Sequence, residues 1–380
     1  MKKTLQTFAV SLLLTVGTTL LSESESVLAQ TSATVQQVPK FRAEGSWAKL
    51  PSQWVMSLVA STWVDDQDHL WVLQRPRALS DEEQARAAPP VLEFDAQGNF
   101  VQGWGGPVDG YDWPQNEHGI HVDTDGFVWV GGNGEEDQIL KFTRDGEFVM
   151  QIGEPGHAKT NADTQNLYRP ADMVVHAPTN ELFVADGYGN KRVIVFDAGT
   201  GTFKRMWGAF GNVPSDDPPS PGEPMGPDGA AQFRPPVHAV RVSNDGHVYV
   251  ADRAGRRVQV FTIDGTYVDQ VFIGRECQLP DCGNGSTAAG LAFSPDADQR
   301  YLYVANRSQA KLMVLDRATL EYLDAFGSWG SDAGQFGTLH HLSADSQGNL
   351  YTAEVTPLMP VNRRVQKFTL THFAPLPAVR

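Results

Sequence analysis

The chain has 380 residues and a formal net charge of −15 at pH 7, from 30 Lys and Arg against 45 Asp and Glu. An acidic chain without a stripe of Lys and Arg is not expected to bind nucleic acid or anionic membrane surfaces. Its length allows one large all-β domain or two smaller domains.

The first 29 residues have the pattern of a secretory signal peptide. A short basic start, MKK, precedes the apolar run FAVSLLLTVGTTLL, and small residues lead up to Ala29. The run is too short to span a bilayer comfortably. We expect residues 1–29 to be removed and residues 30–380 to be secreted or periplasmic, without contact to the membrane. A retained membrane anchor is the alternative.

One sequence unit recurs six times in the remaining chain. Each unit has an apolar strand, a turn of the Asp-Gly or Asn-Gly type, and a second strand with an aromatic anchor. The cores of the second strands are LWVLQR (70–75), FVWVGG (127–132), LFVADG (182–187), VYVADR (248–253), LYVANR (302–307) and LYTAEV (350–355). Their aromatic anchors are 48 to 66 positions apart, a pattern typical of propeller blades. We predict an all-β fold with a single six-bladed β-propeller domain and a central channel.

The two ends of the chain are predicted to meet in the last blade. Third strands such as VIVF and fourth strands such as FVQGWG complete the first five units, but the sixth unit stops after RVQKFTL. Upstream of the first unit, KFRAEGSWAKL (40–50) has the pattern of the missing outer strand. Because an open blade edge leaves backbone groups unpaired, we expect this N-terminal segment to complete the sixth blade.

The chain has two cysteines, Cys277 and Cys282, in the segment CQLPDC. In an oxidising compartment they could close a small disulfide loop. They lack the partners of a metal site, so we favour the disulfide.

A histidine lies eleven residues before the aromatic anchor of units two, four and six: His118, His238 and His340. The first strand of a blade lines the channel, and alternate blades of a six-bladed ring are related by about a third of a turn. The three imidazoles should therefore converge on the axis. Zinc accepts three neutral imidazoles and keeps a fourth position open in catalytic sites. We predict zinc or another divalent metal here; three unrelated histidines paired with backbone groups are the alternative.

Three more residues are predicted at the same mouth of the channel. The second strand of a blade returns to the face where the first began, and the second-strand ends carry Arg75, Tyr188 and Arg253. Arginine binds carboxylates through two parallel hydrogen bonds, and a tyrosine beside a cation can act as a base. For Arg253, an ion pair with the neighbouring Asp252 is the alternative. For Asp186 and Asp252 we expect structural hydrogen bonds in turns.

With these residues the sequence resembles the NHL-repeat propellers, and among them peptidyl-α-hydroxyglycine α-amidating lyase. The resemblance covers roughly residues 50–370 and is strongest in HGIHVDTDGFVWV, ADGYGN, FRPPVHAVRVSNDGHVYVADRAGRRVQVF and HHLSADSQGNLYTAE. It implies that three histidines bind zinc at the propeller mouth and that a tyrosine and two arginines form the active site. The matching positions are His118, His238, His340, Tyr188, Arg75 and Arg253.

The chain departs from that family in three places. Gly189 stands where the family has a disulfide-bonded cysteine, and Thr338 stands where it has a methionine. His341 replaces an aspartate that helps to hold a structural calcium ion, so the resemblance does not carry a calcium site over to this chain.

The resemblance also implies a reaction, in which a C-terminal α-hydroxyglycine splits into an amide and glyoxylate. Zinc would polarise the hydroxyl oxygen, Tyr188 would take or relay its proton, and Arg75 with Arg253 would hold the carboxylate. The substrate would be a peptidyl- or acyl-α-hydroxyglycine, made by a separate hydroxylating monooxygenase. A different small α-hydroxy amide is an open alternative.

Two further functions are compatible with a six-bladed propeller. The rim of an NHL propeller can serve as a non-catalytic platform for a protein or ligand, but such a scaffold does not require histidines in alternate blades. A lactonase-like hydrolase would use a calcium-type cluster of carboxylates and amides on the axis, and the residues at the channel entrance are not of this kind.

Overall fold

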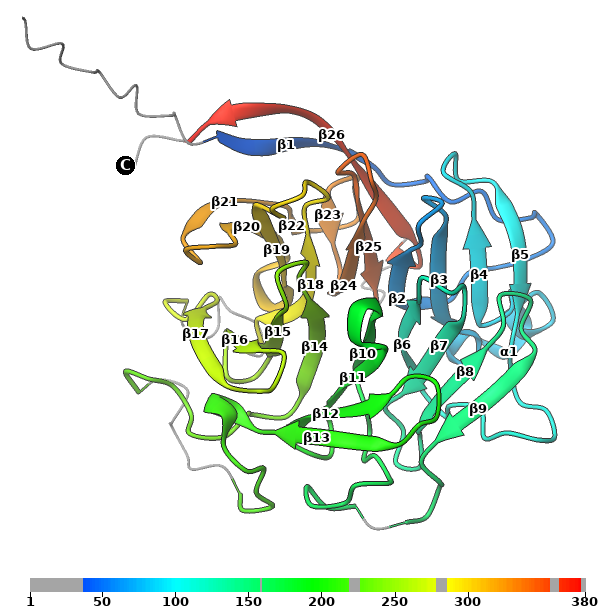
Figure 1. The fold of residues 1–380 in the computed structure, drawn as a ribbon. Coiled ribbons are helices and arrows are strands. Elements are labelled where there is room, and N and C mark those ends of the chain that lie inside the picture. Colours follow the sequence, from blue (N-terminus) through cyan, green and yellow to red (C-terminus); the bar gives the residue numbers. More distant parts are fainter. Residues whose placement is uncertain (1–36, 158, 219–225, 278–285, 356–361, 377–380) are drawn as a thin grey trace, which may run out of the picture. The chain divides into compact units, whose positions relative to one another are not determined.

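A computed structural model gives the arrangement of the strands (Figure 1). It describes residues 37–157, 159–218, 226–277, 286–355 and 362–376. The predicted signal peptide, residues 1–29, lies outside the described residues, and so does Cys282 of the predicted disulfide with Cys277. Within the described ranges, no helix is long and apolar enough to cross a membrane.

Six four-stranded antiparallel sheets surround a central axis as the blades of a propeller (Figure 1). Blade 1 consists of β2 (Leu58–Val64), β3 (Leu70–Arg75), β4 (Val91–Phe94) and β5 (Phe100–Trp104). Blade 2 consists of β6 (Glu117–Val122), β7 (Val128–Gly132), β8 (Ile139–Phe142) and β9 (Phe148–Ile152). Blade 3 consists of β10 (Asp172–His176), β11 (Glu181–Asp186), β12 (Arg192–Asp197) and β13 (Phe203–Trp207). Blade 4 consists of β14 (Val237–Val242), β15 (His247–Asp252), β16 (Arg257–Thr262) and β17 (Tyr267–Phe272). Blade 5 consists of β18 (Ala288–Phe293), β19 (Tyr301–Asn306), β20 (Lys311–Asp316) and β21 (Tyr322–Phe326). Blade 6 consists of β24 (Leu339–Ala344), β25 (Leu350–Glu354), β26 (Val365–Pro375) and β1 (Gln37–Glu44).

The first strand of each blade lines the axis. Each of these strands, β2, β6, β10, β14, β18 and β24, contacts the next, and β24 contacts β2. The ring is therefore closed, and the predicted all-β six-bladed propeller is confirmed. A few short elements lie outside the blades: the parallel pair β22 (Ser328–Trp329) and β23 (Gln335–Phe336), the helical turn α1 (Asp81–Gln84), and the 3-10 turns Pro76–Ala78, Ala177–Thr179, Ala209–Gly211 and Arg307–Gln309.

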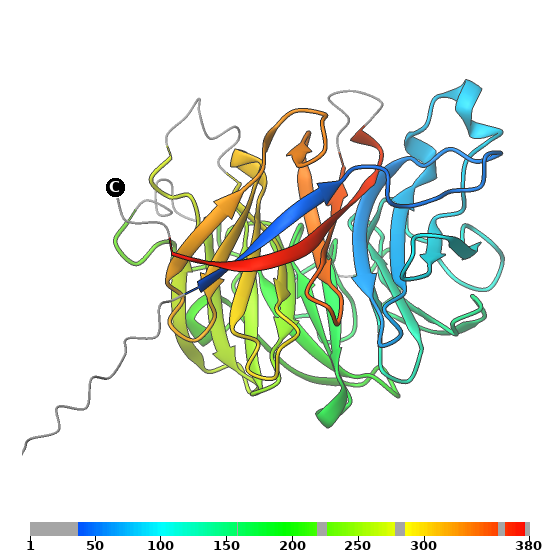
Figure 2. The same cartoon turned by 90° about the horizontal axis from the view of Figure 1, so that it is seen from above.

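The N-terminal strand completes blade 6, as predicted. β1 pairs with β26 in antiparallel register, from Gln37 opposite Pro375 to Glu44 opposite Lys367, and the two strands run side by side along the outside of the ring (Figure 2). β1 begins and ends earlier than the segment 40–50 that the sequence indicated, because the register of β26 extends the pairing to Gln37.

In blades 1 and 2, an aspartate of the first turn lets the tryptophan anchor be buried without an unpaired polar atom. In blade 2, one carboxylate oxygen of Asp123 accepts a hydrogen bond from the backbone N–H of Phe127 in the β6–β7 turn. The other oxygen accepts a hydrogen bond from Nε1 of Trp129 at 2.8 Å, and Trp129 is fully buried. Asp65 and Trp71 have the same arrangement in blade 1. Because a buried indole needs a partner for its N–H, this pair explains why the aspartate and the tryptophan have the same spacing in these two blades.

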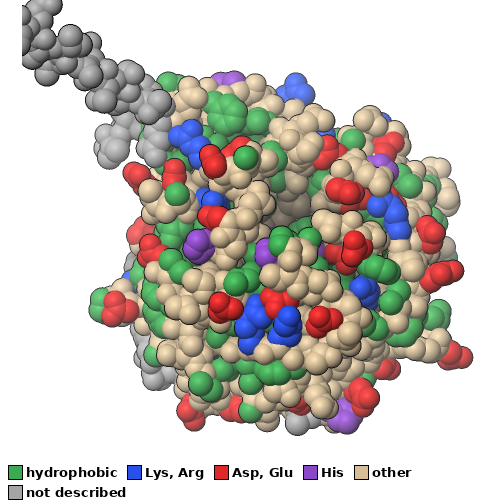
Figure 3. Space-filling view, viewed as in Figure 1, with side chains coloured by type: hydrophobic (Ala, Val, Ile, Leu, Met, Phe, Trp, Pro, Cys, Tyr) green, Lys and Arg blue, Asp and Glu red, His purple; other side chains and the backbone are tan. Residues whose placement is uncertain are grey.

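The channel is open on the face where the first strands end. A cavity of about 390 Å³ lies there, lined by residues of all six first strands, among them Trp63, His121 and Arg241. The face seen in Figure 3 has a hollow at the centre of the ring, with acidic and basic side chains scattered around it. The predicted metal-binding histidines lie toward the other end of these strands, near their starts.

Candidate metal centre

Backbone irregularities turn the three predicted histidines toward the axis. The pairing register of β6 with β7 shifts between Glu117 and Gly119, so that His118 is left out of the ladder. Equivalent shifts occur at His238 in β14 and at His340 in β24. A β-bulge of this kind re-aims a side chain without ending the strand. Each bulge therefore delivers one imidazole to the channel.

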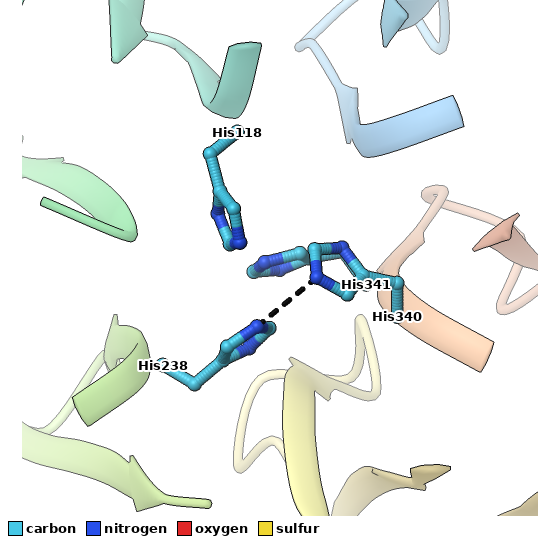
Figure 4. Close-up of side chains that lie close together, drawn as sticks. All are labelled: His118, His238, His340 and His341. Atoms are coloured by element: carbon cyan, nitrogen blue, oxygen red, sulfur yellow. Dashed lines mark hydrogen bonds between the residues drawn. The ribbon is translucent and has the colours of Figure 1, made fainter. Parts of the chain in front are cut away.

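The three imidazoles converge from alternate blades (Figure 4). Their ring centroids are 4.6 to 5.0 Å apart. The Nε2 atoms of His238 and His340 are 3.1 Å from each other. Two imidazole nitrogens that bind the same tetrahedral zinc at ~2.0–2.1 Å lie about 3.3 Å apart. The observed separation fits a shared metal ion with little movement of the side chains.

The intervening blades fix the orientation and the proton of each ring. Nδ1 of each histidine donates a hydrogen bond to the backbone carbonyl of an alanine in the next blade: His118 to Ala171 at 2.7 Å, His238 to Ala289 at 2.8 Å and His340 to Ala60 at 2.6 Å. Because a carbonyl oxygen only accepts, Nδ1 must carry the proton in the neutral ring, and the lone pair is on Nε2. This outer layer of partners is typical of metal-binding histidines. Sequence reasoning missed it, because a backbone carbonyl has no signature of its own.

The electrostatic surroundings keep these rings neutral. His118 and His238 are fully buried and His340 is 2% exposed. Burial first, and then nearby guanidinium and imidazole groups, lower the pKa of each ring well below its usual value. A neutral imidazole with a free Nε2 is the form that binds zinc. The residues present therefore fit a divalent metal with affinity for nitrogen.

A fourth histidine joins this cluster. One nitrogen from each of His118, His238, His340 and His341 lies within 4.8 Å of the others. His341 is fully buried, and neither of its ring nitrogens has a hydrogen-bond partner among the described residues. The sequence pointed to His341 only as a departure from a family pattern. The signal was two consecutive histidines, which a regular strand would place on opposite faces.

Tyr188 and Arg253 lie against the cluster. The phenol oxygen of Tyr188 is 3.0 Å from Nε2 of His118, and it accepts a hydrogen bond from Nη1 of Arg253 at 3.0 Å. The alternative ion pair between Arg253 and Asp252 is not formed, because Asp252 pairs with Arg257 at 2.9 Å. The structure thus brings two of the three predicted mouth residues into contact with each other.

Arg75, the third predicted residue, contacts the strand of His118. Its Nε donates a hydrogen bond to the carbonyl of Glu117 at 2.7 Å, one residue before His118. The charge of Arg75 acts on Tyr188, although no hydrogen bond joins the two side chains among the described contacts. Arg75 therefore holds the backbone of β6 next to His118 and adds positive charge at the mouth of the channel.

Two arginines that the sequence interpretation missed add to this charge. The guanidinium of Arg169 lies 6.0 Å from the ring centroid of Tyr188. Burial, and then the positive charge of Arg253, lower the pKa of Arg307, and the charge of Tyr188 acts on it in the opposite direction. None of Arg75, Arg169, Arg253 and Arg307 forms an ion pair with a carboxylate in the described parts of the chain. The mouth is therefore suited to an anionic ligand.

Hydrogen bonds and close packing hold the loop that carries Tyr188. In the resembled family a disulfide-bonded cysteine stands at the position of Gly189. The backbone N–H groups of Tyr188 and Gly189 donate hydrogen bonds to the carbonyls of Arg169 and Tyr168, both at 3.1 Å. A Cβ atom on Gly189 would overlap the ring of Tyr168. Asp186 anchors the start of the loop through Asn190 and Arg192, which is the structural role expected for it.

The fold and the axial cluster together define a six-bladed β-propeller with a buried histidine site. Residues 167–196 match the family model of the NHL repeat. The chain is therefore a six-bladed propeller with one match to the NHL repeat, and its relatives include proteins named as amidating enzymes.

Three relatives illustrate this relationship. NHL repeat-containing protein 3 of Mus musculus is 27% identical over 289 residues, which are 73% of this chain and 70% of that protein. Peptidyl-glycine alpha-amidating monooxygenase B of Xenopus laevis is 27% identical over 62% of this chain, and the match spans only 25% of that protein. The probable peptidyl-alpha-hydroxyglycine alpha-amidating lyase of Caenorhabditis elegans is 30% identical over 38% of this chain and 36% of that protein.

Among solved structures, virginiamycin B lyase from Staphylococcus aureus matches with a TM-score of 0.49 and 13% sequence identity. The match covers 87% of this chain and 100% of that structure.

Proposed function

We propose that this protein is an exported, metal-dependent carbon–nitrogen lyase that splits a peptidyl- or acyl-α-hydroxyglycine into an amide and glyoxylate. The observation that carries the proposal is the contact of Tyr188 with both His118 and Arg253, directly beside the histidine cluster. A cluster of imidazole nitrogens that can hold a metal, a phenol and a guanidinium without a carboxylate partner are the groups that such a cleavage needs. The similarity to proteins named as amidating enzymes supports the same reaction.

A divalent ion, for which zinc is the first candidate, would be held by His118, His238 and His340 and would supply Lewis acidity toward the substrate hydroxyl oxygen. The phenolate of Tyr188 takes the proton of that hydroxyl group. As the C–O bond becomes the C=O bond of glyoxylate, the C–N bond breaks and its electron pair goes to the amide nitrogen. Tyr188 then returns the proton to this nitrogen, so the phenolate is restored and the reaction balances.

Arg253 assists this proton transfer. Its hydrogen bond to the phenol oxygen stabilises negative charge on that oxygen when the proton has left. The surrounding arginines, which lack carboxylate partners, bind the carboxylate of the hydroxyglycine and hold its hydroxyl group toward the cluster. The excess of positive charge at the mouth thus selects an anionic substrate.

The proposal has consequences for the partner and the compartment. An α-hydroxyglycine is made by oxidation of a glycine Cα–H bond, so a separate hydroxylating monooxygenase would supply the substrate. Export follows from the signal peptide predicted at residues 1–29.

The test is incubation of the zinc-loaded protein with an N-acyl-α-hydroxyglycine, with glyoxylate and the amide measured as products. We expect both products in equal amounts and no activity after chelation of the metal. A variant His121→Ala is the matched control, because His121 is a buried histidine of the same strand as His118 but is not part of the cluster. A correctly folded protein that binds no metal and releases no glyoxylate would instead support the non-catalytic platform.

A further inference from the structure

We infer that His341 is a fourth ligand of the metal centre, on its inner side, so that four imidazoles hold the ion. This inference rests on the proposed function only in taking His118, His238 and His340 as metal ligands. It adds a residue and a coordination number that neither the sequence pattern nor the relatives assign.

The position of His341 follows from an irregularity in β24. The pairing register of β24 with β25 shifts between Leu339 and Leu342. Both residues between them, His340 and His341, are therefore released from the alternation of a regular strand. Their two rings point to the same region of the channel, with centroids 4.8 Å apart (Figure 4). β24 runs from the Tyr188 mouth inward, so His341 is one residue deeper than His340.

The ring of His341 lies against all three predicted ligands. It stacks on His238 with centroids 4.9 Å apart and an interplanar angle of 19°. Its centroid is 5.6 Å from that of His118. One nitrogen from each of the four rings lies inside a 4.8 Å limit, close enough for the four residues to hold one ion together.

The two ring nitrogens of His341 have no other use in the described structure. Both are buried without a hydrogen-bond partner. The guanidinium of Arg241, whose charge acts on this ring, gives its Nη1 hydrogen bonds to Asp172 and to the carbonyl of Val240. A buried polar atom without a partner is costly, and such atoms in native proteins often mark an ion or a water. A metal ion would lie ~2.0–2.1 Å from the ring nitrogen, whereas a hydrogen-bonded water would lie ~2.9 Å from it. The close spacing of the four rings therefore favours a metal ion over a water.

A four-imidazole centre has a distinct chemistry. No carboxylate belongs to the cluster, so oxygen-preferring ions such as calcium and magnesium are disfavoured, whereas zinc, copper, nickel and iron accept imidazole. With His341 as a ligand, the inner side of the ion would be occupied by protein, and the side toward Tyr188 would remain for the substrate.

The test has two measurements on the full protein. The first counts the nitrogen ligands of bound Cu²⁺ from the nitrogen hyperfine structure in the electron paramagnetic resonance spectrum. The second measures the affinity for Zn²⁺ by competition with a chelator. We expect four nitrogens in the wild type and three in His341→Ala. We also expect the affinity for Zn²⁺ to fall by more than the roughly 10–100-fold typical for loss of an outer-shell partner. His121→Ala, which also removes a buried imidazole with an unpaired nitrogen, should change neither quantity.

The outcomes separate this inference from the proposed function. Three nitrogens in the wild type would overturn the inference, and so would an unchanged Zn²⁺ affinity in His341→Ala, even if the lyase activity is present. Four nitrogens in a protein without lyase activity would support the inference and refute the function. If His341→Ala fails to fold, the nitrogen count of the wild type still decides.

Discussion

The phenol oxygen of Tyr188 lies 3.0 Å from Nε2 of His118, the one nitrogen of that ring that is free to accept a proton. Without a metal, the phenol therefore donates its hydrogen bond to His118. A metal ion would take the same lone pair and remove this acceptor. Tyr188 would then be free to turn its oxygen toward a substrate while Arg253 still holds it. Metal binding and activation of the tyrosine are thus coupled through one atom.

Substitution of Tyr188 by phenylalanine tests this coupling. Tyr188→Phe keeps the ring but removes the oxygen, so the metal should stay and the proton transfer should fail. We expect an unchanged zinc content and a kcat lowered by about 10²–10⁴-fold, the usual contribution of a general acid–base group. Zinc analysis and the rate of glyoxylate release measure the two effects. Wild-type turnover in this variant would remove Tyr188 from the mechanism.

His238→Ala should remove the bound metal without unfolding the protein. The ring of His238 contacts other members of the cluster and the Ala289 carbonyl, and the residue lies outside the pairing ladder of β14 with β15. We expect loss of bound zinc and of activity, with an unchanged circular dichroism spectrum. Global unfolding of this variant would show that the cluster is a structural element of the ring.

The buried histidines predict how stability depends on pH. Burial holds the pKa of His118, His238, His340 and His341 well below the ordinary 6.5. As the pH falls through that ordinary value, the unfolded chain binds protons that the folded chain does not, so the metal-free protein loses stability toward acid. Each ring contributes up to about 1.4 kcal/mol per pH unit. Urea unfolding between about pH 7 and pH 5 should therefore give a shallower loss for His341→Ala than for the wild type. An equal slope would contradict the burial of a neutral ring at this position.

Arg307 should determine affinity for the carboxylate of the substrate. Its charge acts on Arg253 and Tyr188, and it has no carboxylate partner among the ion pairs of the described chain. Because hydrogen bonds to charged groups contribute about 1.5–3 kcal/mol, Arg307→Gln should raise KM roughly tenfold or more, with a smaller change in kcat. A methyl ester of the same hydroxyglycine lacks the charge and serves as the control substrate. If KM rises equally for acid and ester, Arg307 has a general role in the shape of the mouth.

The sequence was sufficient for the features that repeat. The aromatic anchors recur in each unit, so the blade number followed from them, and counting back from the anchors located His118, His238 and His340. Features that do not repeat could not be predicted from the sequence. His341 faces the axis only because β24 has a bulge, and a bulge has no sequence signature. Arg169 lies in a loop and Arg307 in a 3-10 turn, and their approach to Tyr188 depends on neighbouring blades.

The closure of the ring by β1 can be tested at Phe41. Its ring stacks on Phe326 of blade 5 with centroids 5.0 Å apart and meets Tyr303 edge-on at 6.0 Å. The N-terminal strand β1 thus packs against blade 5 as well as pairing with β26 of blade 6. Phe41→Ala should lower the free energy of unfolding, by less than the roughly 3–5 kcal/mol of a fully buried phenylalanine, because Phe41 is half-buried.

Phe373→Ala provides the matched control for this prediction. Phe373 lies on the partner strand β26, is 47% exposed and stacks on Tyr301 with ring centroids 6.1 Å apart, so its removal should lower the stability less than Phe41→Ala does. Denaturant unfolding of both variants gives the comparison. If the two substitutions have equal effects, β1 contributes its backbone pairing but no packing to the closed ring. A marked loss for Phe41→Ala alone would show that the side chains of β1 join blades 5 and 6.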